Sequence, residues 1–147
     1  MPNQITVERS IVFNCDLDTV NKVLLDTANY PSFISSIRSA EVIVKSESAS
    51  EVSFKAKVAF FSFEYTIETC GVSENLITFE QKDGFFSFLS GEWRLRETGN
   101  TVEGQYVVSV RLPRLVAGRI VKKAINLYFP NMLNDFKAEA ERKFHNR

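Results

Sequence analysis

The stretch that decides the fold is residues 115–144, LVAGRIVKKAINLYFPNMLNDFKAEAERKF. Its apolar residues recur at every third or fourth position, which is the spacing of one side of an α-helix. They are Val121, Ile125, Tyr128, Met132, Phe136, Ala140 and Phe144. At about 1.5 Å per residue, such a helix would be about 45 Å long. Only a large apolar surface can cover a stripe of that length, so the preceding sequence must supply one.

The residues upstream have the alternating pattern of β-strands. Between residues 52 and 60, the apolar residues Val52, Phe54, Ala56, Val58 and Phe60 alternate with the polar residues Ser53, Lys55 and Lys57, which predicts a strand with one solvent-facing side. Further strands are predicted at residues 5–13, 40–45, 61–67, 76–81, 85–97 and 101–111. A curved sheet closed over one long helix leaves an apolar space between them, so a pocket for a hydrophobic ligand is our first functional hypothesis.

Two short helices are predicted between the first and second strands. Asp16 or Asp18 can cap a helix that ends near Asp26. A second helix is predicted over residues 28–36, with Pro31 in its first turn. The whole order predicts one α+β domain over residues 1–147, in which about seven antiparallel strands face the long C-terminal helix.

Charge and composition exclude several classes of protein. The chain has 18 basic and 18 acidic residues, which are interspersed, so we expect no nucleic-acid partner. No apolar run is long enough to span a membrane, and residues 1–10 do not resemble a signal peptide, so we expect a cytoplasmic protein. Cys15 and Cys70 form no CxxC pair and are predicted to be reduced.

The sequence offers little catalytic chemistry. Its only histidine is His145, close to the C-terminus. It has no paired nucleophile and base, no glycine-rich phosphate loop and no metal-binding motif. We therefore predict no catalytic residue, no metal and no cofactor, and favour a binding protein over an enzyme.

Some residues are candidates for ligand contact. Arg9 shares the apolar face of the first strand, where it either reaches solvent at the strand end or anchors a ligand oxygen as a buried cation. Trp93 alternates with charged neighbours, so its ring should be buried, either against the long helix or as a wall of the cavity. Strand aromatic residues complete this set: Phe54, Phe63, Tyr65 and Tyr106.

Basic residues cluster near the start of the long helix. Arg119, Lys122 and Lys123 lie beside Leu112 and Leu115 in the sequence. They form either a solvated helix face or a transient contact with an anionic membrane surface, where a lipid ligand would be exchanged.

Three segments resemble a known family. They are residues 20–34 (VNKVLLDTANYPSFI), 84–95 (GFFSFLSGEWRL) and 131–144 (NMLNDFKAEAERKF). The first resembles a family helix followed by a Tyr-Pro-x-Phe turn, the second a Gly-x-Trp strand, and the third a closing helix. Together they resemble the START-like (SRPBCC) superfamily, and within it the polyketide cyclase/dehydrase and coenzyme Q-binding proteins.

The resemblance implies a helix-grip fold, in which an antiparallel sheet wraps around the C-terminal helix and encloses an apolar tunnel. It places Tyr30 and Phe33 near the tunnel entrance. It also implies that Trp93 and the inward face of the helix line or floor the tunnel. The helix residues concerned are Val121, Ile125, Tyr128 and Phe129.

Our main functional hypothesis is the binding or carriage of a hydrophobic small molecule, such as an isoprenoid quinone, a fatty acid or another lipid. The first alternative is an aromatic polyketide cyclase or dehydratase, which needs a proton-transfer group in the cavity. The candidates for that role are Arg9, Tyr65, Tyr106 and Glu92. A second alternative is a ribosome-associated regulator, which the overall neutrality disfavours.

Overall fold

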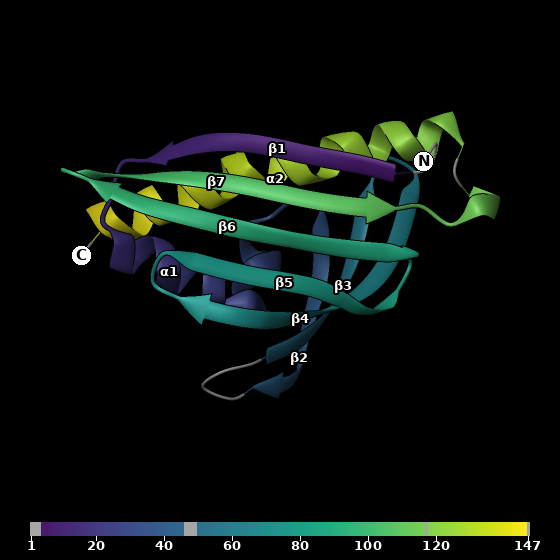
Figure 1. Cartoon of the computed structure of the whole chain (residues 1–147), viewed down its shortest axis with the longest axis horizontal. Helices are drawn as coiled ribbons and strands as arrows, with labels where there is room; N and C mark the ends of the chain where they lie inside the picture. Colours follow the sequence, from purple (N-terminus) through teal and green to yellow (C-terminus); the bar gives the residue numbers. More distant parts are fainter. Residues whose placement is uncertain (1–3, 46–49, 117, 147) are drawn as a thin grey trace.

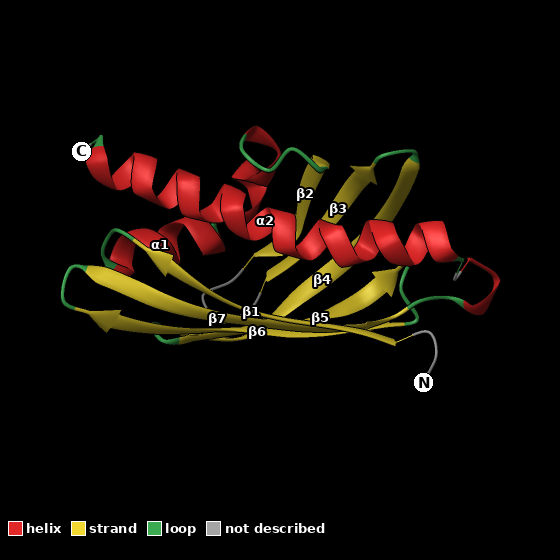
Figure 2. Cartoon of the chain, turned by 90° about the horizontal axis from the view of Figure 1, so that it is seen from above, coloured by secondary structure: helices red, strands yellow, loops and turns green. Residues whose placement is uncertain are grey.

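The computed structural model describes residues 4–45, 50–116 and 118–146, and it has the predicted α+β helix-grip architecture (Figure 1). A seven-stranded antiparallel sheet has the order β1-β7-β6-β5-β4-β3-β2. Its strands are β1 (Gln4–Phe13), β2 (Ile37–Lys45), β3 (Ser50–Val58), β4 (Phe61–Ser73), β5 (Leu76–Gly84), β6 (Phe88–Thr98) and β7 (Thr101–Arg111). The sheet curves around the long helix α2 (Arg119–His145), which lies across its concave face (Figure 2).

The short helices follow from the strand order. Because β1 and β2 are the two edge strands, the chain between them must cross from one side of the sheet to the other. It does so as helix α1 (Leu17–Leu25) and the 3-10 helix η1 (Thr27–Ser32). The Asp16 carboxylate caps α1 by accepting a hydrogen bond of 3.0 Å from the Thr19 N–H. A second 3-10 turn, η2 (Arg114–Val116), precedes α2.

Alternation in the strands produces the core, as predicted. In β3, Val52, Phe54 and Ala56 are buried, whereas Lys55 and Lys57 are exposed. The helix stripe is buried from Ala124 to Ala140, with half-buried residues at its two ends. Burial of these two apolar surfaces against each other is the main favourable term in folding.

Several element boundaries differ from the prediction. Phe60 is fully exposed because β3 ends at Val58, which pairs with Phe61, so Phe60 lies at the tip of the turn. β5 continues past the predicted strand end at residue 81 as far as Gly84, which pairs with Tyr65. Gly84 has a φ of 135°, and a Cβ at this position would lie 2.5 Å from the Tyr65 Cα, so only glycine fits. The long helix begins at Arg119, after the predicted start at residue 115.

Cys15 is buried and Cys70 is exposed, and no disulfide joins them in the described structure. None of the helices in the described part of the chain combines the length and the apolar composition that crossing a bilayer requires.

Candidate ligand-binding site

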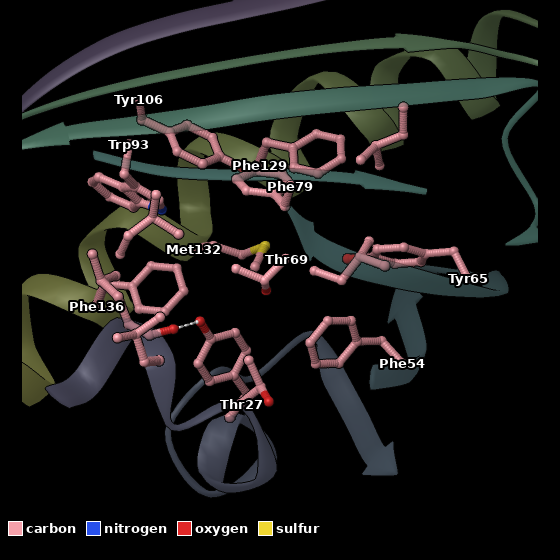
Figure 3. A pocket seen from close by; sticks show the side chains of 16 residues that line it. Thr27, Phe54, Tyr65, Thr69, Phe79, Trp93, Tyr106, Phe129, Met132 and Phe136 are labelled. Atoms are coloured by element: carbon pink, nitrogen blue, oxygen red, sulfur yellow. Dashed lines mark hydrogen bonds between the residues drawn. The ribbon is translucent and has the colours of Figure 1, made fainter. Parts of the chain in front are cut away.

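A cavity of about 60 Å³ lies between α2 and the concave face of the sheet (Figure 3). Side chains from β3 to β7 form one wall, α2 forms the opposite wall, and α1 and η1 close one end. Six of the predicted ligand contacts line it: Tyr30, Phe54, Tyr65, Trp93, Tyr106 and Phe129. The structure therefore brings half of the predicted set together around one space.

Strand register explains how the sheet wall forms. Residues that pair across neighbouring strands point to the same face of the sheet. Where one residue points toward the cavity, its partners on the adjacent strands therefore point toward it too. Phe54 pairs with Tyr65, and Trp93 pairs with both Ile77 and Tyr106. All five side chains line the cavity.

Aromatic rings pack against one another around the space. The Trp93 and Tyr106 ring centroids are 4.8 Å apart, and Tyr30 stacks on Phe54 at 5.6 Å. Phe136 of α2 joins the two groups, since its ring lies 5.1 Å from Tyr30 and 5.8 Å from Trp93. These contacts hold the wall in a defined shape.

The cavity approaches the surface where α1 meets η1. Leu25 is 38 % exposed and Thr27 is half-buried, and both line the space. Among the other lining residues, Phe54 and Leu89 are 1 % and 2 % exposed, and Ile67 and Phe79 are half-buried. Leu25, at the α1–η1 junction, is therefore the most solvent-exposed residue of the wall.

The cavity wall is electrically neutral. Its ionisable side chains in the described structure are Tyr30, Tyr65 and Tyr106, and burial raises the pKa of each hydroxyl above the ordinary value of 10. The Tyr30 hydroxyl donates to the Leu24 carbonyl oxygen. The Tyr65 hydroxyl shares a hydrogen bond of 2.7 Å with the hydroxyl of Tyr128.

The half of the interface nearest the start of α2 is filled by aromatic side chains. The Phe63 ring lies 5.1 Å from Tyr128, 5.5 Å from Phe85 and 5.8 Å from Phe86. Because this cluster fills the space between sheet and helix, Ile125 and Tyr128 are completely buried core residues. The prediction that Phe63, Ile125 and Tyr128 line the cavity is therefore wrong.

Two further predicted contacts, Phe33 and Val121, are half-buried and lie outside the cavity wall. Phe33 packs edge-on against Tyr30 and Phe136, each at 5.8 Å, so it supports the wall from behind. Val121 packs against the core from the first turn of α2.

Arg9 is exposed, which agrees with the predicted alternative of a strand residue that reaches solvent and contradicts its candidacy as a buried ligand anchor. Its guanidinium donates to the Glu8 carbonyl oxygen at 2.9 Å. The reason is that β1 is an edge strand, so a long side chain reaches past the sheet edge into solvent. Glu92 is also outside the cavity wall and forms an ion pair with Arg94.

Ten wall residues were not among the predicted contacts: Leu24, Leu25, Thr27, Ile67, Thr69, Ile77, Phe79, Leu89, Met132 and Phe136. Met132 and Phe136 belong to the helix stripe and carried a clear signal of burial. Thr69 continues the alternation of Tyr65 and Ile67, but β4 runs to Ser73 whereas the strand was predicted to end at residue 67, so Thr69 lay outside the predicted strand.

A separate group of metal-binding residue types lies away from the cavity. Glu68, Cys70 and Glu80 place one potential ligand atom each within 4.8 Å of one another on β4 and β5. Cys70 and Glu80 are exposed and Glu68 is half-buried. Such groups are common on protein surfaces without a metal, and we assign no metal site to them.

The sequence profile of the family described as "Polyketide cyclase / dehydrase and lipid transport" matches residues 14–137. The fold is similar to that of the Zhui aromatase/cyclase from Streptomyces sp. R1128, with 18 % identity, a TM-score of 0.82 and coverage of 95 % of each chain. No curated protein matches the sequence.

Two other solved structures share the fold. A protein from Thermus thermophilus has 15 % identity and a TM-score of 0.83, over 92 % of this chain and 97 % of that one. A START superfamily protein from Mycobacterium smegmatis has 15 % identity and a TM-score of 0.80, over 93 % and 97 %. At these identities the likeness shows the fold alone, and it agrees with the START-like resemblance.

Proposed function

This chain belongs to the polyketide cyclase/dehydrase and lipid transport family, and on that premise we propose that it binds and carries a neutral hydrophobic small molecule. The observation that supports this most strongly is the wall of the cavity, which combines aromatic and aliphatic side chains with hydroxyl groups and no charged group in the described structure. An isoprenoid quinone or another neutral lipid suits such a wall.

A neutral ligand is favoured over a fatty acid anion. Burying a carboxylate without a cation carries a large desolvation cost. Arg9, the cation that we considered for this role, is exposed and does not line the cavity. A fatty acid would therefore enter only in its protonated form.

The volume of about 60 Å³ is small beside the roughly 300–1,000 Å³ of sites for drug-sized ligands. Binding of a lipid must therefore widen the space. Met132 and Leu25 line the cavity, and a methionine side chain changes its shape easily because it is unbranched. We infer that a head group or ring enters first and that side chains at the α1–η1 junction move aside.

Carriage is favoured over catalysis by the acid–base properties of the wall. A general acid or base works best with a pKa near the working pH. Burial moves the pKa of Tyr65 and Tyr106 upward, away from neutrality, so both hydroxyls stay protonated and serve as hydrogen-bond groups. A cyclase or dehydratase would have to use these tyrosines, because Arg9 and Glu92 do not line the cavity.

The proposal predicts opposite pH dependences for two matched ligands, methyl decanoate and decanoic acid. Affinity for the ester should stay constant from about pH 6 to about pH 9, because Tyr30, Tyr65 and Tyr106 remain neutral over that range. Affinity for the acid should fall about tenfold per pH unit, since its carboxyl ionises above about pH 4–5. Trp93 is the only tryptophan and lines the cavity, so its emission reports both titrations. Binding of the acid that is independent of pH would contradict a neutral site.

We also propose that the protein contacts an anionic membrane surface through the start of α2. Leu115 is 100 % exposed and Ile120 is 79 % exposed, and Arg119 and Lys123 are exposed beside them. No acidic residue occurs between residues 104 and 134, although the chain as a whole is neutral. Exposed apolar side chains flanked by basic ones suit the interface of an anionic bilayer.

Charge reversal tests this contact. The double variant Arg119→Glu/Lys123→Glu should bind vesicles of phosphatidylcholine and phosphatidylserine at least about tenfold more weakly, because each basic group near the surface contributes about 1 kcal/mol. The matched control is Lys22→Glu/Lys143→Glu. It also reverses two exposed positive charges, one on α1 and one near the C-terminal end of α2. A vesicle sedimentation assay measures the binding of both double variants. An equal loss of vesicle binding in the two would contradict a contact localised at the start of α2.

A further inference from the structure

Two hydrogen-bond donors in the cavity wall are not used inside the protein. Trp93 and Tyr106 line the space and are each 4 % exposed. Across the described residues, the hydrogen bonds include none to the Trp93 indole N–H or the Tyr106 hydroxyl. Figure 3 shows the Trp93 nitrogen turned toward the cavity. The fully enclosed side-chain atoms that lack a partner in the described structure are Asn21 Oδ1 and Arg111 Nε, so the Trp93 nitrogen and the Tyr106 oxygen each keep some accessible surface, where a ligand group can bond to them.

The other polar groups of the wall differ in this respect. Tyr30 donates to the Leu24 carbonyl, and Tyr65 is bonded to Tyr128. Thr69 accepts a long hydrogen bond of 3.4 Å from the Ser50 hydroxyl. Among the buried polar residues of the wall, Trp93 on β6 and Tyr106 on β7 are the two whose side chains make no hydrogen bond within the described structure.

Register places the two side chains side by side. Trp93 and Tyr106 are directly paired across β6 and β7, and their ring centroids are 4.8 Å apart. Neither β6 nor β7 is an edge strand, because each has a neighbouring strand on both sides. Backbone hydrogen bonds to these neighbours therefore hold both strands in place. Phe136 packs edge-on against Trp93 and fixes its ring from the side of α2.

We propose that Trp93 and Tyr106 form a subsite for the carbonyl oxygen of a neutral ligand, such as a ketone, a quinone or an ester. This inference rests on the proposed function and specifies the chemical class of its ligand. An indole N–H can only donate, and a carbonyl oxygen has two lone pairs, so one oxygen can accept from both groups. The low polarity around the pair strengthens both hydrogen bonds.

Other oxygen groups fit less well. A ligand hydroxyl brings a further donor to a wall that already has two unused donors. A carboxylate brings a charge that no cation in the wall of the described structure balances. The carbonyl oxygen is an acceptor without a proton or a charge, which is what the pair lacks.

The test compares 2-acetylnaphthalene with 2-ethylnaphthalene, which have nearly the same shape and differ in the carbonyl oxygen. Equilibrium dialysis measures the affinity of each compound for the wild-type protein and for Tyr106→Phe. We expect the acetyl-to-ethyl affinity ratio to fall about five- to tenfold in the variant, where tenfold corresponds to about 1.4 kcal/mol. The affinity for 2-ethylnaphthalene should stay within about twofold, because the ring of residue 106 is retained.

Equal weakening of both compounds would show that the hydroxyl serves only packing, and an unchanged ratio would show that it does not contact the oxygen. Either result overturns the subsite. If the wild-type protein bound neither compound, the proposed function itself would fail.

A second readout does not depend on ligand. Tyr106→Phe should leave the unfolding temperature unchanged or raise it, because the lost hydroxyl has no partner in the described structure. Tyr128→Phe is the matched control and should lower it, since it removes the hydrogen bond to Tyr65. A comparable fall in the unfolding temperature of both variants would reveal an internal hydrogen-bond partner for the Tyr106 hydroxyl and contradict the subsite.

Discussion

Replacing Met132 with tryptophan is expected to weaken ligand binding about a hundredfold or more while the protein stays folded. Met132 lines the cavity from α2, and the cavity has a volume of only about 60 Å³. An indole ring directed into that space would occupy the position of the ligand. Because the space is empty of protein atoms, the ring meets less steric resistance there than in a packed core. Equilibrium dialysis with methyl decanoate and urea unfolding measure the two effects.

The matched control is Ile125→Trp, seven residues earlier on the same helix stripe. Ile125 is 0 % exposed and lies outside the cavity wall, so the larger ring must displace packed neighbours. Overpacking of this kind typically costs about 1–3 kcal/mol of unfolding free energy. The two variants should therefore differ in the property that they lose. Ile125→Trp should lose mainly stability, and Met132→Trp should lose mainly ligand affinity. If Met132→Trp retained full affinity, the cavity would not be the binding site.

Truncation of Phe136 to alanine is expected to produce the largest loss of stability, about 3–5 kcal/mol. Its ring contacts Tyr30 at 5.1 Å, Phe33 at 5.8 Å and Trp93 at 5.8 Å, so it connects α2 with η1 and the sheet. Phe136 also lines the cavity, so its removal enlarges the ligand space. Saturating methyl decanoate should restore part of the lost stability, because a ligand that binds only the native state stabilises it.

Phe88→Ala is the control for this truncation. Phe88 is 44 % exposed, and its ring lies 5.9 Å from the Arg111 guanidinium carbon. We expect it to cost less than about 1 kcal/mol in urea unfolding and to be insensitive to ligand. A loss in Phe136→Ala no larger than that of Phe88→Ala would mean that the α2–η1 junction does not depend on this ring.

The architecture was predictable because periodicity decides it. The alternation of Val52, Phe54 and Ala56 marks one face of β3, and the spacing from Ile125 to Phe136 marks one face of α2. These patterns depend only on residue order and on the geometry of strand and helix. The position of Trp93 on the buried face of β6 followed in the same way.

The division between cavity wall and solid core was not predictable from the same patterns. Ile125 and Met132 share one stripe, but only Met132 lines the cavity, because the aromatic cluster around Phe63 fills the space near Ile125. That difference depends on which strand ends meet the helix, which periodicity does not specify. The exposure of Arg9 likewise depends on β1 being an edge strand, a property of sheet order.

Mass spectrometry of small molecules extracted from protein purified without detergent tests the central claim most directly. The account predicts that the wild-type protein retains a neutral lipid bearing a carbonyl group, and that Met132→Trp, purified in parallel, does not. Recovery of the same molecule at the same level from both proteins, or of only charged ligands from the wild type, would contradict binding of a neutral hydrophobic molecule in this cavity.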